Sequence, residues 1–383
     1  MRADRMITPA VLFVIAFLVT ALPFQRSGGD VNGTISFLTT FLTTVGIYAI
    51  FTLALNVQWG YTGVFNFGVA AFFMVGAYTA AIVTKDPASG EYVQYVGGFG
   101  EFLSPNILGA GEWLPFIVAI GAAGLASGVL ALLLSLPTLR LREDYLAIAT
   151  IGIAEFLRRV VIEQDELVNG TSAMVGIPGP LDGYFSPGDW KYAFLVMVIV
   201  FVGLLLFVLE RGIRSPWGRV LRALREDETV TAASGKNVFA FKMQGFVLGA
   251  VIMGMGGAVF AFGRGSVSPL TFDPFFATFL FWAMLIVGGS GNNWGAIAGA
   301  FVIWGVWTIS LQLNGYDLPG VLEVRIFFIR DLLIGSTIVL FLLLRPQGLV
   351  PEQRRVSSWL DRRLRTPSTD PRPPPEADAS ESE

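Results

Sequence analysis

The chain has 383 residues, of which 54% are hydrophobic and only 14% are charged. An ordinary soluble domain is about 25% charged, so this composition indicates a polytopic membrane protein. There is no Cys and no His, which excludes thiol catalysis, disulfides, imidazole acid–base chemistry and the usual zinc and haem ligands. The net charge of −3 argues against nucleic-acid binding.

Ten apolar stretches follow one another along the chain. They are 6–24, 35–56, 64–84, 114–136, 145–162, 191–209, 245–263, 277–289, 294–312 and 326–344. A spanning helix needs roughly 20 apolar residues, and its backbone groups must be hydrogen-bonded internally. We therefore predict an all-α polytopic membrane protein with about ten transmembrane helices. The weakest stretches are 145–162, which ends in charge, and 277–289, which is short.

Lys and Arg residues are distributed unevenly between alternate loops. With a cytoplasmic N-terminus, the cytoplasmic segments hold 18 of them, and the opposite segments hold four: Arg26, Lys85, Arg264 and Arg325. Because cytoplasmic loops carry the excess of positive charge, we predict a cell-membrane (inner or plasma membrane) protein with both termini in the cytoplasm. The transmembrane domain is expected over 1–350, followed by a disordered tail over 351–383 that is rich in Pro, Arg and acidic residues.

The loop at 210–243 is long, charged and regularly patterned. Its apolar residues follow helical spacing: Trp217, Val220, Leu221 and Leu224. The opposite, outer face of that helix would carry Arg219, Arg222 and Arg225. Asp227 and Glu228 stand where a second short helix would begin, and Gly235 stands just past its end. A loop that only sets the topology would also explain the charge, but it needs neither caps nor a glycine stop.

The two halves of the chain, about 6–162 and 191–344, hold five helices each and would therefore lie in opposite orientations. Gly-rich interruptions follow the second and the seventh stretch, at 60–72 and 263–276. Many transporters build a site near the membrane midplane from such inverted repeats. We predict a 5+5 inverted repeat with broken or re-entrant segments, although two ordinary tight loops would also fit. The predicted substrate-path residues are Asn56, Thr62, Gly63, Asn66, Gly68, Ser266, Ser268 and Thr271.

Charged residues inside the apolar stretches are few. Glu155 has the i, i+3 and i+4 spacing to Arg158 and Arg159 that allows pairing within a helix, and both a functional and a structural role are open. The glycines between 249 and 263 favour close helix packing.

Several segments in order resemble one family. They are LALNVQWGYTGVFNFGVAAFFMVGAYTAA, LREDYLAIATIGIAEFLRRVV, NGTSAMVGIPGP, RVLRALREDETVTAASGKNVFAFKMQGFVLGAVIMGMGGAVFA, RGSVSPLTFDP, IVGGSGNNWGAIAGA and RDLLIGSTIVLFLLLRPQGLVPE. Over about 35–352 the chain is similar to the inner-membrane permease subunits of ABC importers for branched-chain amino acids, a family that also includes urea and amide permeases. Ala232, Ala233 and Gly235 resemble its Glu-Ala-Ala and downstream Gly signature.

The resemblance implies a division of labour between subunits. This chain would form the translocation path for hydrophobic amino acids. Its partners would be a second permease chain, two ATPase subunits and an extracytoplasmic substrate-binding protein. The implied ATPase-coupling residues are Arg222, Arg225, Asp227, Glu228, Ala232, Ala233 and Gly235. The sequence has no G-x-x-x-x-G-K-[ST] phosphate loop, so we expect a non-enzyme without cofactors, with ATP hydrolysis in a partner.

Two alternatives remain. The same machinery could carry urea or short amides. A secondary transporter driven by an ion gradient would need membrane-embedded acids, and the near-span acids Glu155 and Asp331 each have an Arg neighbour.

Overall fold

The computed structural model describes residues 2–26, 28–85, 88–90, 93–95, 114–186, 188–313 and 326–352. The tail predicted to be disordered lies, from residue 353 on, outside the described residues. The apolar helices are α1 (Arg2–Arg26), α2 (Val31–Leu55), α3 (Val69–Thr84), α5 (Leu114–Thr138), α6 (Glu143–Ile162), α8 (Trp190–Arg214), α11 (Val238–Arg264), α12 (Leu280–Gly288), α13 (Asn293–Leu313) and α15 (Ile326–Leu344). Three further helices are α7 (Asp165–Val168), α9 (Pro216–Glu226) and α10 (Glu228–Ala233).

Each of the ten predicted apolar stretches overlaps one of these apolar helices. Within the described part of the chain, six helices are long and apolar enough to cross a membrane: α1, α2, α5, α8, α11 and α13. Two apolar helices, Val69–Thr84 and Phe276–Gly288, are shorter. The described strands form only two small antiparallel pairs, β1 (Ala88–Gly90) with β2 (Val93–Tyr95), and β3 (Met174–Val175) with β4 (Ser266–Val267). The chain is therefore an all-α membrane protein.

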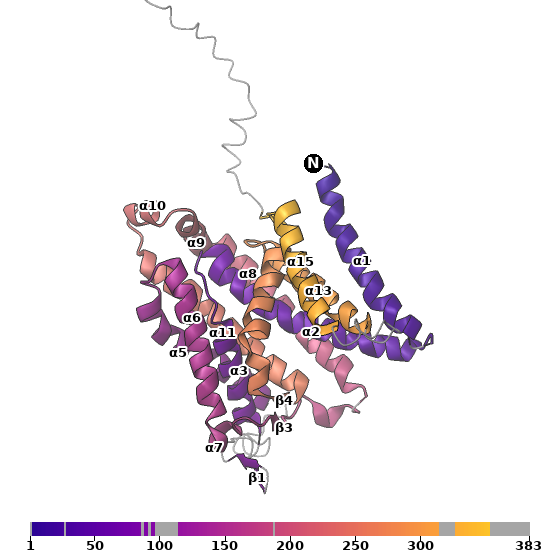
Figure 1. Cartoon of the computed structure of the whole chain (residues 1–383). Helices are drawn as coiled ribbons and strands as arrows, with labels where there is room; N and C mark the ends of the chain where they lie inside the picture. The colour runs from indigo at the N-terminus through magenta and orange to yellow at the C-terminus, as the bar shows by residue number, and fades with distance from the viewer. Residues whose placement is uncertain are drawn as a thin grey trace, which may run out of the picture. The chain divides into compact units, whose positions relative to one another are not determined.

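Helices α3, α5 and α11 pack against one another at very short range (Figure 1). Gly76 of α3 faces Gly254 of α11 so closely that a Cβ atom at residue 76 would overlap the Gly254 carbonyl oxygen. In lipid, helix association depends on such close packing because burial of apolar surface gives little advantage. The glycine-rich part of α11 is thus a packing surface, as the sequence predicts.

Helix α2 is the central helix of a second group and contacts α1, α8, α11, α12 and α13. Its C-terminal half is almost fully buried, and Phe51 stacks on Phe281 of α12 with ring centroids 4.7 Å apart. Tyr48 makes edge contacts with Phe281 and with Trp304 of α13. This packing fixes the end of α2, where the candidate site begins.

Candidate functional site

The chain breaks out of the α-helix directly after α2. Asn56–Tyr61 form a π-helix, and a non-helical segment then runs to Gly68, directly before α3. Gly63 in this segment has a φ of +76°, a conformation that favours glycine. The second break lies between α11 and α12. It consists of β4, a 3₁₀ helix (Pro269–Phe272) and a π-helix (Phe275–Phe279). Both predicted interruptions are therefore real breaks in the helical structure.

Asn56 connects the first break to two distant parts of the chain. Its Oδ1 accepts a hydrogen bond from the Gly291 amide at 2.8 Å, and its Nδ2 donates to Asn293 Oδ1 at 3.0 Å. The same Asn293 oxygen accepts from the Tyr61 hydroxyl at 3.1 Å, and Asn293 Nδ2 donates to Glu210 at 3.1 Å. The turn between α12 and α13 and the end of α8 are thus held to the break.

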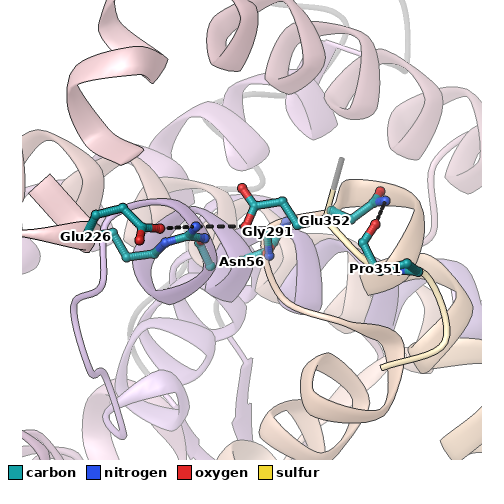
Figure 2. Close-up of polar contacts among 8 residues, drawn as sticks. Asn56, Glu226, Gly291, Pro351 and Glu352 are labelled. Carbon is teal, nitrogen blue, oxygen red and sulfur yellow. Dashed lines mark hydrogen bonds and ion pairs between the residues drawn. The ribbon is translucent and has the colours of Figure 1, made fainter. Parts of the chain in front are cut away.

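Arg225 of α9 connects the charged loop to the same place. Its guanidinium donates to the carbonyl oxygen of Gly60 and forms an ion pair with Glu352, with 2.7 Å between Nη2 and Oε2. A second ion pair joins it to Glu226 at 2.9 Å (Figure 2). We call the set Asn56, Gly60, Arg225, Gly291, Asn293 and Glu352 the junction. It brings the loop, the break after α2, the α12–α13 turn and the C-terminal segment together.

The prediction that Arg222 and Arg225 lie on an outer face is wrong. Arg222 donates to the carbonyl oxygen of Ile213 at 3.1 Å and lies 5.9 Å from the Tyr61 ring centroid, and the Arg225 side chain is only 22% exposed. The physical reason is that helix ends and breaks leave carbonyl groups without intrahelical donors, and guanidinium groups supply them. Arg219 alone of the three is exposed, as predicted.

The loop has the two helices that the sequence predicts. Asp227 caps α10 by accepting from the amides of Thr229 and Val230, at 2.8 and 3.0 Å. The Thr229 hydroxyl and these amides hold the pKa of the Asp227 carboxyl below its usual range. Gly235 follows α10 with a φ of +79°. The acidic cap and the glycine stop thus enclose α10, as their spacing predicts.

Helix α10 is largely exposed. Ala232 and Ala233 are exposed, and Val230 exposes 65% of its surface. Glu228 forms an ion pair with Lys242 of α11, which fixes α10 against the start of that helix. Exposed apolar residues on a helix that is held in place by an ion pair form a surface that a partner can contact.

The predicted path residues fall into two groups. Asn56, Thr62, Asn66 and Gly68 are buried at the first break, beside the half-buried Gly63. Asn66 shows their bonding: its Nδ2 donates to Gln58 at 2.7 Å and its Oδ1 accepts from the Gly68 amide at 2.8 Å. Ser266, Ser268 and Thr271 are half-buried at the second break. No hydrogen bond joins the two groups within the described residues.

The accessible side chains of the first break are aromatic, which the sequence reasoning missed. Phe65 and Phe67 are partly exposed, and they stack on Trp282 with centroids 5.8 and 4.6 Å apart. Trp59 adds a fourth ring, 4.9 Å from Trp282. The sequence contains a signal for this arrangement. Residues in an extended segment point alternately to opposite sides, which places Phe65 and Phe67 on one side and Asn66 on the other.

The charges near the C-terminal end of α6 are paired. Glu155 bonds Arg158 and Arg159, both at 2.8 Å, and the Arg158 side chain is 14% exposed. This confirms that the spacing allows intrahelical pairing and places no unpaired acid at these positions.

The family model for the permease component of branched-chain amino acid transport systems matches residues 37–342. The chain belongs to this family. The match runs from α2 to α15 and therefore includes both breaks, the loop and most of the junction.

Relatives support the same family. The high-affinity branched-chain amino acid permease protein LivM of Escherichia coli K12 is 30% identical over 90% of this chain and 75% of its own length. The LivM protein of Salmonella typhimurium is 29% identical over the same shares. A probable LivM protein of Methanocaldococcus jannaschii is 27% identical over 86% of this chain and 98% of its own. No solved structure matches. As a member of this permease family, the chain is a multi-pass inner-membrane protein.

Proposed function

We propose that the chain is one membrane subunit of an ABC importer for branched-chain, apolar amino acids, working with a second permease chain, two ATPase subunits and an extracytoplasmic binding protein. The observation that carries this proposal is the family match over residues 37–342 together with the junction inside the matched region. A loop that is bonded to a broken helix can transmit the movement of an ATPase to the path.

The ten-helix, 5+5 inverted-repeat arrangement is part of the proposal. Its support is the likeness of the two breaks, since each combines a π-helix with a non-helical segment: Asn56–Tyr61 after α2, and Phe275–Phe279 before α12. Broken helices near the midplane are the usual way in which transporters form a cavity between repeats. Irregular backbone at that depth needs protein or water around it.

We assign different roles to the predicted path residues. Gly63, Ser266, Ser268 and Thr271, which are partly accessible, would face the cargo together with the rings of Phe65 and Phe67. The buried members, which are Asn56, Thr62, Asn66 and Gly68, would hold the break in shape. An aromatic surface suits an apolar side chain, and hydroxyl groups can guide a zwitterion without holding it tightly.

The proposed orientation places both termini in the cytoplasm. Besides the Lys and Arg distribution, it is supported by the junction, because Gly60, Arg225, Gly291 and Glu352 all come from segments assigned to that side. Reporter fusions before Met1 and after Pro351 should both report a cytoplasmic location. An extracytoplasmic signal from either fusion would contradict the arrangement.

Helix α10 is proposed to bind the ATPase. Replacing Ala233 by Asp should leave the permease folded, because residue 233 is exposed, but it should reduce co-purification of the ATPase and leucine-stimulated ATP hydrolysis, since an unpaired charge would be desolvated in the contact. The matched control is Ser186→Asp, at an exposed position on the proposed opposite side.

Wild-type attachment of the ATPase in the Ala233→Asp variant would refute α10 as the docking surface.

Uptake of leucine by vesicles with the complete importer tests the cargo. Uptake of urea but not of leucine would contradict the proposed cargo.

A further inference from the structure

A cavity of about 560 Å³, its open mouth included, lies between α2, α8 and α11. Lys191, at the start of α8, and Arg264, at the end of α11, both line it. These helix ends are the ones that the Lys and Arg distribution assigns to the extracytoplasmic side. The cavity is thus separate from the junction, and the chain continues from Arg264 directly into the second break.

The two cations in this cavity contact neutral groups among the described residues. Lys191 Nζ donates to the Ser36 hydroxyl at 2.6 Å, and the Arg264 guanidinium lies 5.7 Å from the Phe260 ring centroid. In the part of the chain that the structure describes, neither forms an ion pair with a carboxylate, and no acidic residue lines the cavity. Two unpaired positive charges that face one cavity of a membrane protein favour an anionic ligand.

The wall formed by α2 offers acceptors. Thr40, Thr43 and Thr44 lie on one face of the helix and line the cavity. Their hydroxyl groups donate to backbone carbonyls one turn earlier, at 3.1, 2.8 and 2.9 Å. Because each proton is engaged, each oxygen presents only lone pairs to the cavity. Such a wall suits an ammonium group, which donates hydrogen bonds.

The rest of the lining is apolar and completes the match. Ile47, Trp190, Phe194 and Phe260 surround the polar groups. The cavity therefore combines cations for an anionic group, acceptors for a cationic group and apolar surface for a short side chain. That combination is the chemistry of an apolar α-amino acid in its zwitterionic form.

We propose that this cavity is an extracytoplasmic binding site for the zwitterionic cargo. The carboxylate is bound by Lys191 and Arg264, and the ammonium group is bound by the threonine oxygens. The inference rests on the proposed function, and it adds a site that the cargo occupies before it reaches Ser266 and Ser268. A phosphoethanolamine lipid headgroup has the same two charges, so the test must separate the two sources.

The test uses a single Cys in this Cys-free chain. Thr44→Cys, in the complete importer in phosphatidylcholine nanodiscs, should react with a neutral thiosulfonate, and L-leucine should slow the reaction several-fold. The slowing should disappear when Lys191→Gln or Arg264→Gln is added. Ser186→Cys, an exposed site on the same proposed side, is the control and should react at a rate that leucine does not change.

The outcomes distinguish this inference from the proposed function. If vesicles with the wild-type importer take up leucine but leucine does not protect Thr44→Cys, the cavity is not a cargo site and the proposed function stands. If phosphatidylethanolamine protects the thiol and leucine does not, the cavity is a lipid site and the inference is overturned. Protection that persists in both cation variants would also overturn it. Absence of branched-chain amino acid uptake by the wild-type importer would instead contradict the proposed function.

Discussion

Gly76→Leu is expected to prevent the chain from reaching its folded state. Any side chain at this position would overlap the backbone of Gly254, and a backbone oxygen cannot move aside as a flexible side chain can. Overpacking typically lowers the stability of a core by about 1–3 kcal/mol. The variant would also lose the packing between α3 and α11, because the leucine would force the two helices apart. Size-exclusion chromatography of a fluorescent fusion in mild detergent should show little or no monodisperse protein.

Gly121→Leu is the matched control for that experiment. Gly121 lies on the neighbouring helix α5, is exposed, and has nothing near the position of an added Cβ atom. The control should be recovered at the wild-type level, because leucine is a better helix former than glycine and suits a lipid-facing position. Equal recovery of both variants would show that α3 and α11 do not pack through Gly76.

Arg225→Glu is expected to abolish leucine uptake while the chain still inserts. The change places three carboxyl groups together at residues 225, 226 and 352 and removes the donor to the Gly60 carbonyl. The local cost should be below the roughly 3–5 kcal/mol of breaking a fully buried ion pair, since the Arg225 and Glu352 side chains are 22% and 29% exposed. Leucine uptake and leucine-stimulated ATP hydrolysis should both be measured.

The reciprocal exchange makes this prediction specific. Glu352→Arg alone should also reduce uptake, and combining it with Arg225→Glu should restore part of it. Restoration should be incomplete, because a glutamate at residue 225 cannot donate to Gly60. Glu226→Gln, at a side chain that is 73% exposed, should change little. Normal uptake in both single variants would remove the ion pair from the coupling mechanism.

Local signals in the sequence predicted the local structure well. The acidic cap at Asp227 and the glycine stop at Gly235 enclose α10 where their spacing places it. The apolar stretches contain helices because hydropathy and length alone specify them. These features depend on neighbouring residues, which the sequence displays directly.

The junction could not be predicted, because its partners are far apart in the sequence. The partner of Arg225 is Glu352, and helical spacing around residue 225 says nothing about residue 352. The outer-face assignment of Arg225 failed for this reason, and that of Arg222 failed because its guanidinium donates to the Ile213 carbonyl near the end of α8. Reversing both charges would therefore disturb these contacts as well as any docking surface. Tests of docking therefore belong on α10.

The C-terminal segment has a consequence for how the subunit is made. Leu349 and Val350 donate to the carbonyls of Val287 and Gly288, and Glu352 then meets Arg225. Residue 225 leaves the ribosome more than 100 residues before its partner does. During synthesis, Arg225 therefore lacks its ion-pair partner until the last helix and the C-terminal segment have been made. A truncated or stalled chain would lack the Arg225–Glu352 ion pair, so that under the proposed function its loop could not pass on the movement of the ATPase.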